Sequence, residues 1–208
     1  MRRACEGLAR PDAARLLSGS GEAATAAFAG LSLLLLRPAL LGNPRAPFGL
    51  AGIYLALGAV SLAATGPVTS PTPAAHSRGV RGRAPLPTVL GIGIGAVAAG
   101  AFLPGPRPAA RLMVLTPAAI LLNCLAAVSE EAFFRRFLYG RLERHGVAVA
   151  VGASALTFAL IHVPVYGTSV LWLDLGAGLL FGWQRWASGR WETSAATHVA
   201  ANLLAVIQ

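Results

Sequence analysis

Apolar stretches of helical length recur along the whole chain, separated by short polar segments rich in Arg, Pro and Gly. A helix needs about 20 apolar residues to cross the ~30 Å hydrocarbon layer of a membrane, and each stretch is close to that length. The pattern therefore predicts an all-α, polytopic membrane bundle of about seven transmembrane helices, within a range of six to eight. The predicted spans are Ala23–Leu41, Phe48–Thr65, Leu86–Leu103, Leu112–Arg144, Val147–Val163, Val170–Trp186 and Thr193–Ile207.

The first stretch is interrupted near its end by Arg37 and Pro38. Proline has no backbone N–H to donate, so we expect the first helix to end there. An interrupted run of this kind also fits a helix that lies in the membrane interface, and a six-span bundle without it is the alternative.

Gly66–Pro87, a segment rich in Pro, Gly, Ser and Arg, follows the second stretch and is typical of a flexible loop. It predicts two parts: an N-terminal membrane hairpin with its loop, residues 1–87, and a working membrane core, residues 88–208.

The composition supports a membrane protein. Hydrophobic residues make up 55% of the 208 positions and charged residues 12%, whereas a soluble domain carries about 25% charged residues. The formal net charge is +9, and every one of the 17 basic residues is Arg. This balance excludes a disordered chain and argues against a water-soluble nucleic-acid binder, so no nucleic-acid partner is expected. Cys5 and Cys124 form neither a disulfide framework nor a zinc-ribbon pattern.

The Arg residues are unequally distributed between the two sides of the membrane when seven spans are assumed with the N-terminus in the cytoplasm. Thirteen fall in predicted inner segments: Arg2, Arg3, Arg10, Arg15, Arg78, Arg81, Arg83, Arg135, Arg136, Arg141, Arg144, Arg185 and Arg190. Four fall in predicted outer segments: Arg37, Arg45, Arg107 and Arg111. The excess of inner Arg predicts a multi-pass plasma-membrane protein with a cytoplasmic N-terminus and an external C-terminus.

A few polar side chains interrupt the apolar stretches. They are Asn123, Glu130, Glu131, His162, Asp174, His198 and Asn202. A charge at bilayer depth costs at least ~2.5–3.5 kcal/mol on insertion scales, so these groups need partners, water or a function. Asp174 has no role that the sequence assigns. Glycines at 176, 178 and 182 follow it with the spacing of close helix packing.

Ser129–Arg136 places two carboxylates side by side. On a helix, Glu131 and Arg135 are i,i+4 neighbours and form a pair, while Glu130 points about 100° away. One carboxylate would then brace the scaffold and the other would handle a proton or a water. The alternative is the end of an interfacial helix with solvated charges.

The histidines form two further groups. His162 ends the run Phe158–His162, where a structural hydrogen bond is the alternative to catalysis. His198 and Asn202 are i,i+4 neighbours that could fix a tautomer or aim two donors at one point, or form a bond between helices. Counted from the predicted cytoplasmic helix ends, Glu130, His162 and His198 lie at depths of roughly 18, 24 and 12 Å. Helix tilt can absorb this spread, so the three side chains can share a site in the inner half or middle of the bilayer.

These groups favour water as the nucleophile, because no Ser or Cys has an obvious base. Glu130 with His162 would activate the water, and His198 with Asn202 would stabilise the oxyanion. A zinc ion held by Glu130, His162 and His198 is the alternative, although the His-Glu-x-x-His helix is absent.

The motifs Glu130-Glu131-x-x-x-Arg135, Phe158-x-x-x-His162 and His198-x-x-x-Asn202 resemble the marks of the CPBP family (CAAX protease and bacteriocin-processing, also called Abi) of intramembrane endopeptidases. The resemblance covers about residues 112–208. It implies a helical membrane domain with a polar, water-filled cavity. It also implies Glu130 and His162 as water activators, His198 and Asn202 as oxyanion groups, and Glu131 and Arg135 as a supporting pair. It leaves open whether a metal is needed.

The expected activity is therefore hydrolysis of a peptide bond in a membrane-embedded protein or peptide. The Arg-only bias indicates a bacterial or other prokaryotic source, where peptide maturation, self-immunity or removal of sorting tags is expected rather than cleavage of prenylated CAAX proteins. A non-catalytic binding or immunity protein of the same fold is one alternative. A small proton-coupled transporter is another, but no internal repeat supports it.

Overall fold

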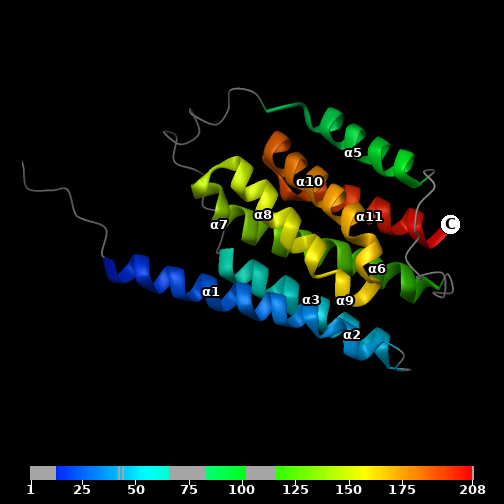
Figure 1. Cartoon of the computed structure of the whole chain (residues 1–208), viewed down its shortest axis with the longest axis horizontal. Helices are drawn as coiled ribbons and strands as arrows, with labels where there is room; N and C mark the ends of the chain where they lie inside the picture. Colours follow the sequence, from blue (N-terminus) through cyan, green and yellow to red (C-terminus); the bar gives the residue numbers. More distant parts are fainter. Residues whose placement is uncertain (1–12, 42, 44, 66–82, 102–115, 208) are drawn as a thin grey trace, which may run out of the picture.

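The computed structural model of the chain describes residues 13–41, 43, 45–65, 83–101 and 116–207, which form a bundle of antiparallel helices (Figure 1). The elements are α1 (Ala13–Leu35), α2 (Arg37–Leu40), α3 (Ala46–Thr65), α5 (Leu86–Ala101), α6 (Pro117–Glu131), η2 (Ala132–Leu138), α7 (Tyr139–Leu142), η3 (Glu143–His145), α8 (Val147–Leu160), α9 (Val163–Tyr166), η4 (Thr168–Val170), α10 (Leu171–Ser188) and α11 (Trp191–Ile207). No described residue lies in a strand, so the all-α prediction is confirmed.

Four described helical segments are long and apolar enough to cross a membrane: Gly21–Leu40, Ala46–Thr65, Pro117–His145 and Val147–Tyr166. α5, α10 and α11 occupy the other three predicted spans, but they are shorter or carry more polar residues. The predicted polytopic helical bundle is confirmed. The predicted loop falls largely on residues 66–82, outside the described part, so the two-part division stays a prediction.

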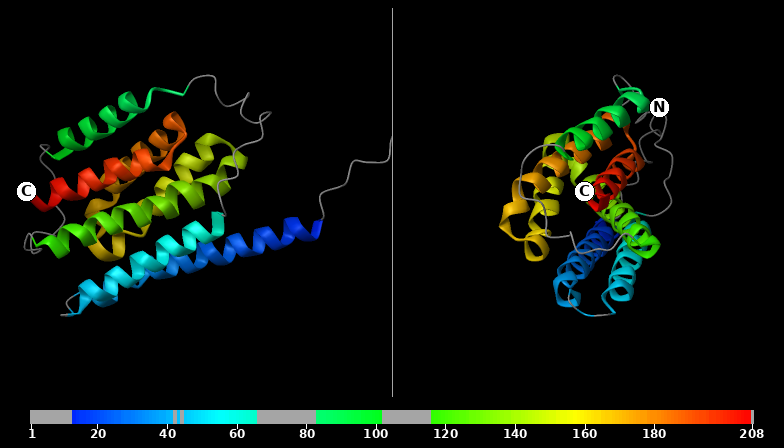
Figure 2. Two further views of the ribbon diagram at one scale, coloured as in Figure 1. Left: turned by 180° about the vertical axis from the view of Figure 1, so that it is seen from behind. Right: turned by 90° about the vertical axis from the view of Figure 1, so that its right-hand side faces the viewer.

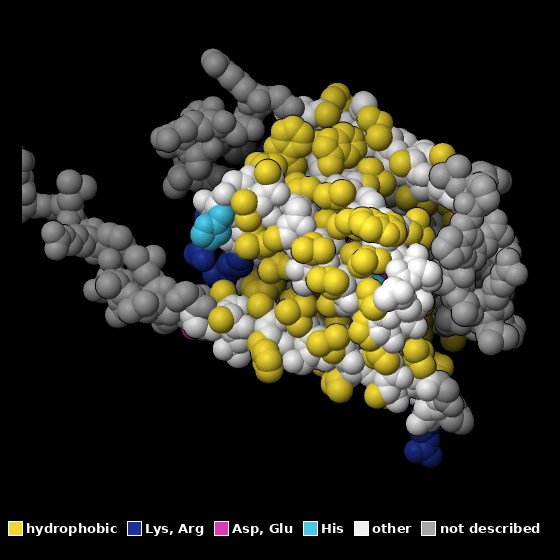
Figure 3. All heavy atoms as spheres, viewed as in Figure 1, with side chains coloured by type: hydrophobic (Ala, Val, Ile, Leu, Met, Phe, Trp, Pro, Cys, Tyr) yellow, Lys and Arg dark blue, Asp and Glu magenta, His cyan; other side chains and the backbone are white. Residues whose placement is uncertain are grey.

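The helices form layers. α1 and α3 pack together on one side of the bundle, α5 lies at the opposite edge against α10 and α11, and α6, α8, α10 and α11 lie between (Figure 1, Figure 2). Apolar side chains are spread over the face seen in Figure 3, and Phe28, Phe48 and Trp172 are at least three-quarters exposed. This surface suits contact with lipid.

The break expected at the end of the first stretch is present. α1 ends at Leu35, and α2 begins at Arg37 with Pro38 in its first turn, as a residue without a backbone N–H requires. Gly30 of α1 lies so close to the ring of Phe133 that a side chain there would collide with it. The first stretch is therefore packed into the bundle, and it is one of the four candidate spans.

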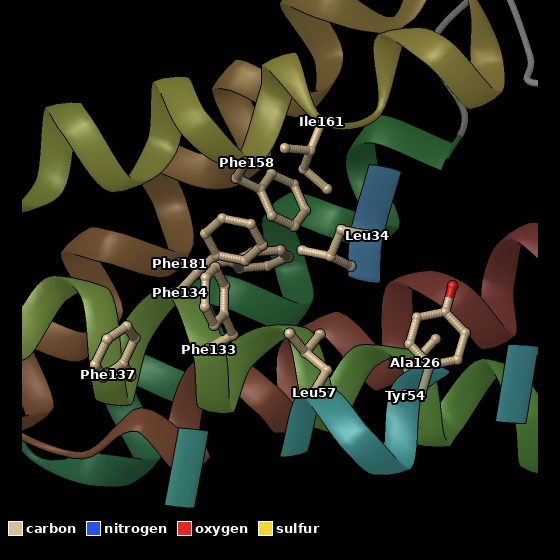
Figure 4. Close-up of a cluster of buried hydrophobic side chains, with 10 residues drawn as sticks. All are labelled: Leu34, Tyr54, Leu57, Ala126, Phe133, Phe134, Phe137, Phe158, Ile161 and Phe181. Carbon is tan, nitrogen blue, oxygen red and sulfur yellow. The ribbon is translucent and has the colours of Figure 1, made fainter. Parts of the chain in front are cut away.

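The core is an aromatic cluster at the centre of the bundle (Figure 4). The rings of Phe134 and Phe158 meet edge to face with centroids 5.3 Å apart, and Phe158 meets Phe181 in the same way at 6.2 Å. Such edge-to-face pairs contribute ~0.5–1.5 kcal/mol beyond their burial. The cluster fixes η2, α8 and α10 relative to one another.

Glycine sets the approach of α10 to α8. A Cβ added at Gly178 would lie 2.9 Å from Ala155 Cα, and one at Gly182 would lie 3.0 Å from Val151. The predicted close packing is therefore present at these two positions, but Gly176 faces open space.

Two Arg side chains join the ends of α3 and η2–α7. Arg136 Nε donates to Thr65 Oγ1 at 3.0 Å, and Arg141 Nη2 donates to the Ala64 carbonyl at 2.8 Å. Cations at a helix C-terminus complement its dipole. These helix ends lie at the same end of the bundle, as the seven-span prediction requires, but which side faces the cytoplasm stays a prediction. Several Arg residues of that count lie outside the described residues: Arg2, Arg3, Arg10, Arg78, Arg81, Arg107 and Arg111.

Candidate active site

Glu130 and Glu131 are the last residues of α6, and Glu131 is the central residue of the long span Pro117–His145. The helix widens directly after them into the π-helical segment η2, a feature that is frequent at functional sites. Both carboxylates are buried, with exposed fractions of 3% and 0%. They face in different directions and have different partners, as their adjacent helical positions predict.

Glu130 contacts one guanidinium and one imidazole. Its Oε1 accepts a 2.6 Å hydrogen bond from Arg37 Nη1, and its Oε2 lies 3.6 Å from His162 Nε2. The second separation is longer than a direct hydrogen bond. The structure thus brings together Glu130 and His162, the two residues predicted to activate water.

His162 has one tautomer fixed by the backbone. α8 ends at Leu160, and Pro164 lies in the first turn of the next short helix, α9. At this break, His162 Nδ1 lies 2.7 Å from the Phe158 carbonyl oxygen. A carbonyl can only accept, so Nδ1 carries the hydrogen, and Nε2 is the nitrogen presented to Glu130.

The predicted position of Arg37 in an outer loop is wrong. The chain was expected to expose it as one of the outer loop charges, but it is only 3% exposed and lies in the site. Its Nε donates to the Leu34 carbonyl at 2.9 Å and its Nη2 to the Ile161 carbonyl at 3.0 Å. The physical reason is that the helix break before Pro38 turns this side chain inward. The only signal in the sequence is a base inside an apolar stretch.

Glu131 forms the second carboxylate group. Arg135 Nη1 lies 3.3 Å from Glu131 Oε1, so the predicted i,i+4 pair is present, and both side chains are fully buried. Arg135 Nη2 also donates to the Gly178 carbonyl at 3.0 Å. Its guanidinium lies over the rings of Phe158 and Phe181, with distances to the centroids of 4.8 and 5.4 Å. These cation–π contacts replace part of the lost hydration.

His198 belongs to the Glu131 group. Its Nδ1 lies 3.1 Å from Glu131 Oε1, and its ring stacks on Phe181 with centroids 5.0 Å apart. The partner of Nδ1 is thus a carboxylate on another helix rather than Asn202. Asn202 Nδ2 instead donates to the Asn123 carbonyl at 3.2 Å.

The site therefore consists of two carboxylate–histidine pairs whose imidazoles both lie close to one ring. Phe158 lies 4.5 Å from His162 and 5.7 Å from His198, measured between ring centroids. Its place in the aromatic cluster is visible in Figure 4. The carboxylates lie at the middle of the candidate span Pro117–His145, and the depth of the site in the bilayer stays a prediction. His162 lies nearer the end of the bundle that carries α2 and α9.

Asp174 of α10 interacts electrostatically with both pairs, through Glu130, His162 and His198. Its Oδ2 is buried and has no hydrogen-bond partner within the described part of the chain. The structure therefore places Asp174 near the site and leaves this one oxygen unpaired among the described residues.

The proposed zinc ligands do not form a cation site. Among the described residues, no group of three or more His, Cys, Asp or Glu side chains is arranged to hold a metal ion. Glu130 Oε1 already bonds to the cation Arg37, and His198 Nδ1 is turned to Glu131. A second cation beside the guanidinium would meet like-charge repulsion, so this donor set does not fit zinc.

Comparison with known proteins adds one finding. Residues 112–204 match the family model described as type II CAAX prenyl endopeptidase Rce1-like. The matched segment contains all seven residues of the three motifs, while Arg37 lies outside it. Comparison with curated proteins and with solved structures gives no significant match.

Proposed function

Because residues 112–204 form an Rce1-like domain of the CPBP protease family, we propose that this membrane protein is an intramembrane endopeptidase. It hydrolyses peptide bonds of a membrane-associated protein or peptide. The observation that carries the proposal is the pair of buried carboxylate–histidine contacts, Glu130–His162 and Glu131–His198, inside the matched segment.

The first pair supplies the base. With the hydrogen of His162 on Nδ1, its Nε2 and Glu130 Oε2 are both acceptors, 3.6 Å apart. A water molecule entering between them donates one hydrogen to each, which turns its oxygen lone pairs toward the substrate. The pair takes a proton as the water attacks the peptide carbonyl, and later returns it to the leaving amine.

The second pair supplies the oxyanion donors. His198 Nδ1 faces Glu131, so Nε2 is the nitrogen that can face the substrate. In the imidazolium form, which carries a hydrogen on each ring nitrogen, Nε2 donates to the oxyanion. The amide of Asn202, one turn further along α11, has a second hydrogen for the same oxygen. Arg135 and the stacked Phe181 hold this half in place.

No metal takes part in the proposed reaction. Arg37 holds one oxygen of Glu130 and Glu131 holds Nδ1 of His198, so the groups act directly on water and substrate. The substrate reaches them within the bilayer of the cell membrane, and the predicted orientation, N-terminus cytoplasmic and C-terminus outside, is part of the proposal.

The test compares new protein N-termini in cells that produce the wild type or Glu130→Gln, His162→Ala or His198→Ala. Labelling of N-termini and mass spectrometry of the membrane fraction detects cleavage without knowledge of the substrate. We expect cleavage products of membrane proteins with the wild type and none with the three variants. The control is Glu192→Gln, which removes an exposed carboxylate and keeps the products. Identical products with wild type and Glu130→Gln would leave a binding or immunity protein of this fold as the answer.

A further inference from the structure

Glu130, His162 and Arg37 form one group of side chains, and Arg37 alone among the three lies outside the matched residues 112–204. Arg37 belongs to the N-terminal hairpin, at the junction of α1 and α2, and is separated from Glu130 by 93 positions along the chain. Residues 112–204 alone thus contain both members of the Glu131–Arg135 pair but leave Glu130 without its guanidinium.

We propose that Arg37 is a positioning residue of the active site, which keeps the Glu130 carboxylate ionised and directed at His162. The inference rests on the proposed function, because it assigns Glu130 as the base. It extends the working site beyond the matched domain into the hairpin.

Charge is the first argument. A carboxylate that is 3% exposed in an apolar bundle takes up a proton unless an opposite charge compensates it. Arg37 Nη1 contacts Glu130 Oε1 directly at 2.6 Å, whereas Arg135 contacts Glu131. Each buried carboxylate therefore has a guanidinium of its own. The charged and titratable groups around the Arg37–Glu130 pair are Tyr54 of α3, Arg135 of η2, His162 after α8, Tyr166 of α9, Asp174 of α10 and His198 of α11.

Geometry is the second argument. The planar guanidinium of Arg37 binds three elements at once: α1 through Leu34, α6 through Glu130, and the end of α8 through Ile161. Ile161 directly precedes His162, so the same side chain sets the spacing between carboxylate and imidazole. A lysine supplies the charge but lacks the rigid fork that reaches both partners.

The experiment compares wild type, Arg37→Gln, Arg37→Lys and the control Arg45→Gln, which changes an exposed Arg in the turn after α2. The proteins are purified in detergent micelles and assayed on a substrate identified by the N-terminal labelling. For Arg37→Gln we expect kcat/KM to fall about 100-fold or more at neutral pH, the range that a general base contributes. As the pH is lowered, Arg37→Gln should also lose its activity at a higher pH than the wild type does. Arg37→Lys regains part of the rate, and Arg45→Gln keeps the wild-type profile.

A second measurement does not depend on activity. Infrared difference spectra at neutral pH should show the carbonyl band of a protonated carboxyl group in Arg37→Gln, and this band should be absent from Arg37→Gln/Glu130→Gln and from the wild type. If Arg37→Gln does not accumulate, the double variant should restore its abundance, because it removes both buried charges.

The outcomes separate the two proposals. Equal cleavage by wild type and Glu130→Gln overturns the proposed function, whatever Arg37 does. If the wild type cleaves, and Arg37→Gln keeps the wild-type pH profile and shows no carboxyl band, only the role of Arg37 is overturned. Failure of both Arg37→Gln and the double variant to accumulate also overturns it, since Arg37 would then serve folding alone.

Discussion

The contact between α10 and α8 gives a quantitative prediction for Gly178→Ala. The added methyl group would lie 2.9 Å from Ala155 Cα, 3.0 Å from its Cβ and 3.1 Å from its carbonyl oxygen. Two of these atoms belong to the backbone, so no change of rotamer relieves the collision. α8 must move away by about half an ångström or more to restore ordinary carbon contacts near 3.5 Å.

Overpacking of this kind costs ~1–3 kcal/mol. Alanine also has a better helix propensity than glycine, by about 1 kcal/mol, which offsets part of that cost. Gly176→Ala is the matched control, because it makes the same change on the same helix but faces open space. The propensity gain is common to both variants, so the difference between them isolates the collision. We expect Gly178→Ala to be less stable than Gly176→Ala by ~1–3 kcal/mol.

The measurement is the free energy of unfolding in detergent micelles, followed by circular dichroism for wild type and both variants. Gly178→Ala should also lower cleavage activity, because the Gly178 carbonyl accepts a hydrogen bond from Arg135. Equal unfolding free energies for the two variants would refute the close approach of the helices.

The remaining predictions concern charge and metal. Arg135→Met leaves Glu131 buried without its cation, which should cost ~3–5 kcal/mol and lower the amount of protein in membranes. Abundance and stability should recover in Arg135→Met/Glu131→Gln, and normal abundance of the single variant would contradict the bracing role. Exhaustive chelation should leave the cleavage rate of the wild type unchanged, since Arg37 occupies one oxygen of Glu130. A loss of rate that Zn²⁺ reverses would show that the reaction needs the metal.

The features that could be predicted from the sequence are those that depend on residues close together in one helix. The apolar stretches predicted the helices, and the i,i+4 spacing predicted the Glu131–Arg135 pair, because both depend on residues within one helix. The break before Pro38 was predictable for the same reason, since it follows from the missing N–H of proline.

Contacts between helices were not predictable in the same way. The Arg37–Glu130 bond and the His198–Glu131 bond depend on which helix faces meet. That choice is set by packing at places such as Gly178 and by the aromatic cluster around Phe158. The count of Arg residues in inner and outer segments placed Arg37 in a loop, because such a count contains no information about the direction in which a side chain points.

The π-helical turn after Glu131 has a consequence for the whole long span. The Tyr139 N–H bonds to the Phe134 carbonyl, five residues back, so this stretch contains one residue more than an α-helix of the same number of turns. One residue corresponds to a rotation of about 100°. The carboxylates before the turn therefore face the two histidines, while Arg136 and Arg141 face the end of α3. Removal of a single residue from this turn would rotate one half of the helix relative to the other. Glu130 and Glu131 could then no longer face the histidines while Arg136 and Arg141 bind the end of α3.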